Sequence, residues 1–220
     1  MGEPYQKEHI SGLRERKKRQ TRETIADVAL GLFIERGFDA VTVAEIAQAA
    51  EVAVKTVFNY FPTKEDLFFD RQAEVEDAWS RVARKRASGE SVVAALRRDF
   101  LDKLARRDPS SGLNEDFVTF ARLIQSSPSL QVREREIGER SRDALARTLV
   151  AESGAASDDL TPRLVASLVE AIYRTLHAES RRRLLAGERA NAIYPDMLAA
   201  ANRAFDLLET GIGSYGLRQL

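Results

Sequence analysis

The sequence has no cysteine and only two histidines, His9 and His177, among its 220 residues. The absence of cysteine excludes disulfides, thiolate catalysis and cysteine-based metal sites. Two isolated histidines do not supply a histidine-rich metal site. The chain also has no convergent set of a nucleophile and a base, and no carboxylates at the spacing of metal ligands. We therefore expect no metal, no cofactor and no catalytic residues, and the protein is not expected to be an enzyme.

Long apolar runs are missing as well. No stretch approaches the roughly 20 apolar residues that span a bilayer, and the N-terminal MGEPYQKEHISG lacks the apolar core of a signal peptide. A cytoplasmic protein without membrane contact is expected.

The formal net charge is zero, which argues against indiscriminate coating of nucleic acid. The charge is nevertheless uneven, because residues 12–22 carry six basic side chains against one acid, Glu15. Such a run is typical of a solvated arm or of an arm that binds nucleic acid.

Helical signals dominate what is present and predict an all-α protein of about nine helices. An apolar stripe from Ile25 to Phe33 precedes Gly37, so a first helix ends near residue 36. Thr42 and Glu45 form a capping box for a second helix that ends near residue 49. A third helix is expected over 54–60. Thr63 caps a long fourth helix that reaches about residue 85. Five later helices are expected near 92–107, 113–125, 128–152, 161–186 and 194–211.

Three short helices at the N-terminus, with a tight break between the second and third, are the shape of a helix-turn-helix. They could also be ordinary bundle helices, but the outer residues of the third helix favour DNA binding. These residues are the kinds that reach base edges and phosphates: Lys55, Thr56, Asn59 and Tyr60. Val57, Phe58 and Phe61 are expected to face the core. Thr42 and Lys64 lie at neighbouring helix starts, where backbone N–H groups favour phosphate oxygens.

The stretch TRETIADVALGLFIERGFDAVTVAEIAQAAEVAVKTVFNYFPTKEDLF resembles the DNA-binding domain of TetR-type regulators. ERGFDAVTVAEIA matches the end of the first helix and the second helix, and TVFNYFPTKEDLF matches the recognition helix and the start of the fourth. The resemblance covers roughly residues 14–70. It implies a DNA-binding domain at 1–64 and a helical domain at 65–220 that senses a small molecule and dimerises.

The resemblance also implies which residues contact operator DNA. They are Arg14, Lys17, Lys18, Arg19, Thr42, Lys55, Thr56, Asn59, Tyr60 and Lys64. The first four belong to a basic extension that enters the minor groove in some members. Thr42 and Lys64 match positions that hold phosphates, and the others lie on the recognition helix.

Three positions depart from the commoner family pattern. Glu51 stands where a glycine is frequent in the turn, which puts the turn geometry in doubt. Ala53 replaces a serine or threonine cap, a loss worth about 1 kcal/mol. Lys55 replaces a small residue and is expected to add a contact. The operator preference of other members therefore cannot be transferred to this chain.

The C-terminal two-thirds resemble the family only in architecture. Two apolar stripes lie on the last two helices, and most of their residues are expected to pack in the core. In TetR-like proteins these two helices also form the dimer interface. The interface candidates are Val165, Leu168, Val169, Ile172, Met197, Ala201, Phe205 and Leu208. A mainly apolar effector pocket between helices is expected, although side chains of this kind more often pack in the core. The pocket candidates are Trp79, Phe100, Phe117, Phe120, Tyr173 and His177.

The function expected from these observations is a homodimeric transcription regulator. We expect a repressor that binds a near-palindromic operator and that an unidentified small molecule releases. Within the same fold, a transcriptional activator or dual regulator is the alternative. In a different class, the alternative is a helical protein-interaction module.

Overall fold

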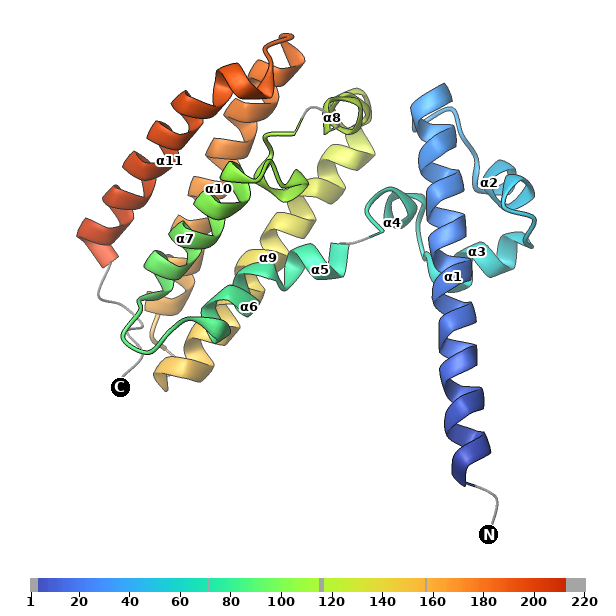
Figure 1. Ribbon diagram of the computed structural model, residues 1–220, viewed down its shortest axis with the longest axis horizontal. Coiled ribbons are helices and arrows are strands. Elements are labelled where there is room, and N and C mark those ends of the chain that lie inside the picture. Colours follow the sequence, from blue (N-terminus) through green and yellow to red (C-terminus); the bar gives the residue numbers. More distant parts are fainter. Residues whose placement is uncertain (1–3, 71, 115–116, 157, 213–220) are drawn as a thin grey trace. The chain divides into compact units, whose positions relative to one another are not determined.

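A computed structural model describes residues 4–70, 72–114, 117–156 and 158–212. Within these ranges all regular structure is helical, with eleven α-helices and one short 3-10 helix, which confirms the predicted all-α class (Figure 1). The chain divides into two compact units, Met1–Arg71 and Gln72–Leu220. This division lies one short helix beyond the boundary expected after residue 64. None of the described helices combines the length and the apolar composition needed to cross a membrane.

The first unit contains α1 (Pro4–Arg36), α2 (Val43–Ala49), α3 (Val54–Tyr60) and α4 (Lys64–Phe68). α1 ends where Gly37 adopts a φ of +86°, a left-handed conformation that glycine takes without steric cost. The four helices share one small core. Its largest buried side chains are Ile25, Phe33, Phe38, Ile46, Phe61, Leu67 and Phe68. The second and third helices therefore have the predicted bounds, and their packing is that of a helix-turn-helix unit.

The expected long fourth helix is wrong. Residues 63–85 form three separate helices, α4, α5 (Gln72–Glu76) and α6 (Ala78–Lys85). The reason is that the apolar stripe serves two cores: Phe68 is buried in the first unit, whereas Trp79 packs on the core of the second. Apolar periodicity alone cannot distinguish one long helix from consecutive short helices whose apolar residues keep the same spacing. This split accounts for the count of eleven α-helices instead of about nine.

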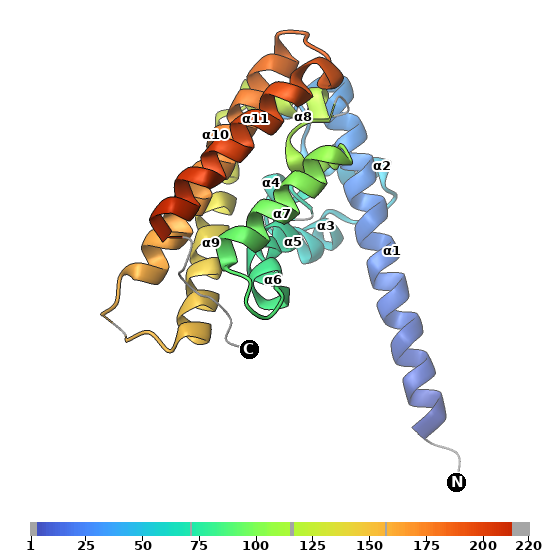
Figure 2. The same cartoon turned by 60° about the vertical axis from the view of Figure 1, so that its left-hand side comes forward.

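The second unit is a helical bundle that continues from α5 and α6. Its other helices are α7 (Val92–Ala105), the 3-10 helix η1 (Pro109–Ser111), α8 (Phe117–Ser126), α9 (Pro128–Ser153), α10 (Thr161–Leu185) and α11 (Ala190–Ile212). α10 packs against both α9 and α11, and Figure 2 shows α10 and α11 side by side. The last helix begins at Ala190 rather than near Tyr194, because Ala190 and Ile193 are both buried in the bundle.

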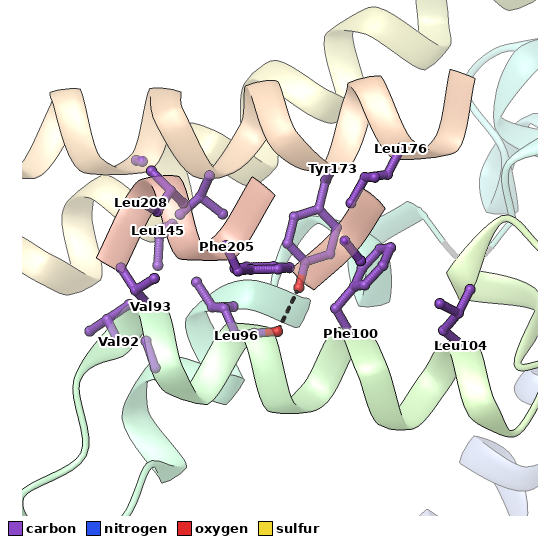
Figure 3. Packing of buried hydrophobic residues seen from close by; sticks show 14 of the residues in the cluster. Val92, Val93, Leu96, Phe100, Leu104, Leu145, Tyr173, Leu176, Phe205 and Leu208 are labelled. Atoms are coloured by element: carbon purple, nitrogen blue, oxygen red, sulfur yellow. Dashed lines mark hydrogen bonds between the residues drawn. The ribbon is translucent and has the colours of Figure 1, made fainter. Parts of the chain in front are cut away.

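The core of the second unit is formed mainly by α7, α10 and α11 (Figure 3). Tyr173 lies at its centre, and its hydroxyl donates a hydrogen bond to the carbonyl of Leu96 at 3.2 Å. At one edge, the Arg97 guanidinium on α7 lies 2.7 Å from Asp206 and 3.0 Å from Glu209 on α11. Apolar packing and a multiple ion pair therefore hold α7 and α11 together.

Most of the residues expected at a dimer interface belong to this core instead. Six of the eight are buried within their own chain: Val165, Val169, Met197, Ala201, Phe205 and Leu208. Ile172 is partly buried against the same core, and Leu168 keeps 44% of its surface exposed. The apolar stripes were recognised correctly, but the sequence does not reveal whether such a stripe packs inside its own chain or against a partner.

Candidate nucleic-acid interface

The start of α2 is fixed by the predicted capping box. The Thr42 hydroxyl accepts from the backbone N–H of Glu45 at 3.3 Å, and the Thr42 N–H donates to the Glu45 carboxylate at 2.8 Å. Thr42 Oγ1 also lies 2.7 Å from Glu45 Oε2, and Arg36 pairs with Oε1 at 2.7 Å. These bonds, led by that from the Thr42 hydroxyl, lower the pKa of Glu45 to about 2. Both donors of Thr42 are thus engaged by a charged carboxylate, so a phosphate contact at Thr42, which stays a prediction, requires one of them to be released.

The turn between α2 and α3 carries Glu51 at the position where the family pattern often has glycine. Glu51 adopts a φ of +54°, a left-handed conformation that costs a non-glycine residue about 1 kcal/mol or more. The backbone N–H of the following residue, Val52, still bonds to the carbonyl of Ala47 at 2.9 Å. The N-cap of α3 is Ala53, which makes no side-chain hydrogen bond. The left-handed Glu51 and the missing side-chain cap therefore lower the stability of this segment, in which α2 and α3 are both formed.

The recognition helix α3 presents a mixed polar and apolar face. Lys55 and Asn59 are exposed, while Thr56 and Tyr60 are partly buried. Val57 is fully buried, as expected. Phe58 is not: 48% of its surface is exposed, as is 40% of Val54. The expectation that Phe58 faces the core is wrong. Val57 and Phe61 occupy the inner side, and Phe58 lies about 100° further around the helix than Val57.

Arg22 holds the far end of α3 in place. Its guanidinium donates to the Tyr60 carbonyl at 2.9 Å and to the Asp70 carbonyl at 2.8 Å, and it lies 4.2 Å from the centroid of the Phe61 ring. The basic run at residues 12–22 indicates only that Arg22 carries a charge. Its spacing of three residues from Ile25, the first buried residue of the stripe, is the signal that places it on the inner face of α1.

Lys64 has a similar structural role at the start of α4. Its ammonium donates to the carbonyls of Phe38 and Val41 at 2.9 and 3.0 Å and lies 4.3 Å from the centroid of the Phe38 ring. Lys64 thereby fixes the turn between α1 and α2. An ammonium has three N–H donors, so a phosphate contact, which stays a prediction for Lys64, would use the third.

The basic segment at residues 14–19 lies within α1 and is helical rather than an extended arm. Lys17, Lys18 and Arg19 are exposed. An α-helix with its side chains is about 10–12 Å wide, whereas the minor groove of B-DNA is only about 6 Å wide. In this conformation the segment cannot enter a minor groove, and its charges suit phosphates along the edge of a groove instead.

Comparison with known proteins agrees with this geometry. Residues 25–70 match the family model of bacterial regulatory proteins of the TetR family, and residues 90–213 match that of the MftR C-terminal domain. The HTH-type transcriptional regulator TcmR of Streptomyces glaucescens is 31% identical over 172 residues, which cover 76% of each chain. This chain belongs to the TetR family. It is a DNA-binding transcriptional regulator with an MftR-type C-terminal domain and not an enzyme.

Solved structures of two bacterial repressors have the same fold. NalD of Pseudomonas aeruginosa, a secondary repressor of a multidrug efflux pump, is 17% identical with a TM-score of 0.53, and the match covers 84% of this chain and 97% of NalD. FadR of Thermus thermophilus, a TetR-family repressor in complex with lauroyl-CoA, is 23% identical with a TM-score of 0.50. That match covers 87% of this chain and 94% of FadR.

In the second unit, four of the six pocket candidates form one aromatic cluster. Tyr173 lies 4.9 Å from Trp79 and 5.1 Å from Phe100 between ring centroids, and His177 stacks on Phe100 at 6.0 Å. The other two candidates, Phe117 and Phe120 on α8, contact each other at 5.2 Å. A separate surface cleft of about 370 Å³ lies between α6 and α9, and none of the six candidates lines it.

His177 is the most unusual member of the aromatic cluster. Its Nε2 atom is buried and has no hydrogen-bond partner among the described residues. Burial, together with the nearby charges of Arg181 and Lys103, lowers the pKa of His177 to about 4. The adjoining loop is tightly fitted, since a Cβ on Gly112, which has a φ of +73°, would lie 2.9 Å from the His177 ring. At neutral pH the ring is therefore uncharged and holds one unused hydrogen-bonding atom inside the bundle.

Proposed function

We propose that this regulator is a homodimeric repressor that binds a near-palindromic operator and leaves it when a small molecule binds the sensor domain. The observation that supports the proposal most directly is the way in which hydrogen bonds hold α3 within the first unit. Arg22 and Lys64 tie the segments around this helix together from inside the unit, while Lys55 and Asn59 remain exposed. A rigidly held helix with free polar side chains is suited to reading base edges in a major groove.

The proposed DNA contacts divide into two kinds. Lys55, Thr56, Asn59 and Tyr60 lie on α3 and would contact bases and nearby phosphates. Lys17, Lys18 and Arg19 are exposed along α1 and would contact phosphates, and Arg14 lies in the same helix. Phosphate contacts set affinity and its dependence on salt, whereas base contacts set sequence preference.

Dimerisation would use exposed apolar residues of the last two long helices. Leu164 and Leu168 on α10 are 60% and 44% exposed, and Leu207 on α11 is 77% exposed. Burial of such leucines against a second copy is favourable. A two-fold dimer also places two recognition helices about 34–36 Å apart, one turn of DNA. Light scattering should give twice the monomer mass, and Leu164→Glu with Leu168→Glu should give the monomer mass.

The effector would bind beside the aromatic cluster, where His177 Nε2 offers a hydrogen bond. A ligand can shift the protein away from DNA only if it binds more tightly to a conformation that fits the operator poorly. Lauroyl-CoA belongs to the Thermus FadR complex, and its chemical class is not transferred to this chain. In the Phe100→Ala and His177→Ala variants, the effector should be less able to release the protein from DNA. Operator binding without effector should not be weakened.

The test is selection of bound fragments from random double-stranded DNA, followed at two salt concentrations. Enrichment of a motif with two-fold symmetry is expected and would also supply an assay for effectors. Placing that operator beside a promoter in a transcription assay should lower transcript yield, and a small molecule that restores it is the effector. Enrichment of a single, unrepeated half-site would contradict the dimer, and increased transcription would contradict the repressor.

A further inference from the structure

The outward face of the recognition helix carries two large apolar side chains. Val54 and Phe58 are four residues apart and therefore lie on the same side of α3, one turn from each other. They expose 40% and 48% of their surfaces. Lys55 is exposed beside them. The exposed side of α3 thus presents two apolar groups, with the cation of Lys55 next to them.

These two side chains are not needed for the core of the first unit. Val57 and Phe61 fill the inner side of this segment and expose 0% and 1% of their surfaces. Exposed apolar side chains that do not serve the core are candidates for contact with a partner. In a chain that belongs to a DNA-binding family, the partner that meets α3 is the major groove of the operator.

We propose that Val54 and Phe58 determine operator specificity by packing against the C5-methyl groups of thymines. The thymine methyl is the apolar group that B-DNA presents in its major groove, and apolar side chains recognise it. Side chains one helical turn apart are separated by about 5.4 Å, and base pairs by about 3.4 Å. The two contacted thymines should therefore lie one or two base steps apart. Lys55 is exposed next to Val54 and Phe58 and is suited to a guanine, whose O6 and N7 accept hydrogen bonds.

Replacing thymine by deoxyuridine tests the proposal, because it removes the methyl group and leaves base pairing unchanged. The operator is the one enriched by selection, so this experiment builds on the proposed function. Burial of one methyl group corresponds to about a fourfold change in affinity. We expect about this loss at one or two thymines of each half-site, and no change at the other thymines.

Protein variants assign each methyl group to a side chain. Phe58→Ala should abolish the effect of deoxyuridine at one thymine and Val54→Ala at the other, while Phe58→Leu should retain part of it. The matched control is Ile34→Ala, because Ile34 is a similarly exposed apolar residue, at 52%, on another helix of the same unit. This control should keep the full effect at both thymines. Circular dichroism of each variant verifies that it is folded.

Three results would overturn the proposal: no effect of deoxyuridine at any thymine, an effect that persists in both alanine variants, or operator binding that Phe58→Ala leaves unchanged. The last would assign the apolar face to a different partner. If selection enriches no motif, the proposed operator fails, and crosslinking still decides the present point. Mixed-sequence DNA with 5-iododeoxyuridine in place of thymidine should crosslink to the peptide that contains Phe58, and crosslinks confined to other peptides would refute the contact.

Discussion

Replacement of Arg22 by alanine removes two hydrogen bonds that join α1 to the carbonyls of Tyr60 and Asp70, together with the contact on the Phe61 ring. Hydrogen bonds to a charged group contribute about 1.5–3 kcal/mol each, and a cation over an aromatic ring adds about 0.5–1 kcal/mol at exposed sites. Arg22 is partly exposed, so water replaces part of what is lost. We expect the first unit to lose about 2–3 kcal/mol of unfolding free energy.

The assay combines urea denaturation with hydrogen exchange of the full-length protein. Arg22→Ala should increase exchange at both segments that Arg22 joins, the end of α3 and the chain after α4. Arg22→Lys should behave almost like alanine, because a single ammonium cannot reproduce the two-pronged geometry of a guanidinium. Arg19→Ala is the matched control: the Arg19 side chain is 70% exposed, and its loss should leave stability and exchange unchanged.

DNA binding separates a positioning role from direct contact with DNA. Arg22→Ala should weaken operator binding while the slope of log affinity against log salt stays the same. Arg19→Ala should instead reduce this slope by about one unit, as expected for one lost phosphate contact. If Arg22→Ala lowers the salt slope by one unit and leaves stability unchanged, Arg22 contacts phosphate and the reasoning from its hydrogen bonds is refuted.

Three other perturbations have defined outcomes. Lys64→Ala should cost about 2 kcal/mol in urea denaturation, because it breaks two bonds to carbonyls; a smaller salt slope as well would establish its phosphate contact. The lowered pKa of His177 means that stability is full above pH 6.5 and declines as the pH falls toward 4, by about 3 kcal/mol in total. His177→Phe should flatten this decline in denaturation midpoints, and an unchanged curve would contradict the assignment. The lowered pKa of Glu45 stabilises the fold above pH 4.5, and this contribution is lost as the pH falls toward 2. Thr42→Val should reduce that acid loss, and equal losses in both proteins would argue against the capping box as its cause.

Features that depend on neighbours along the chain were determined by the sequence alone. The capping box of Thr42 and Glu45 and the end of α1 at Gly37 were predicted correctly, because they arise from hydrogen bonds and backbone conformations within a few residues. The helix-turn-helix was predicted from three short helices, the polar residues of the third and the resemblance to the family, and the family match confirms it. Long helices such as α9 and α10 agreed closely with expectation because their apolar periodicity extends over many turns.

Only the tertiary structure decided what each stripe or charge faces. Phe68 and Trp79 fit one helical stripe in the sequence yet belong to different cores. Phe205 is buried within its own chain, although the sequence made it a candidate for the dimer interface. Phe58 is exposed, although the sequence predicted that it faces the core. Arg22 bonds to carbonyls inside the unit, although it belongs to a basic run typical of a solvated arm. In each case the outcome depends on contacts between residues far apart in the chain, such as Arg22 with Tyr60 and Asp70, and local periodicity contains no information on which distant surfaces will meet.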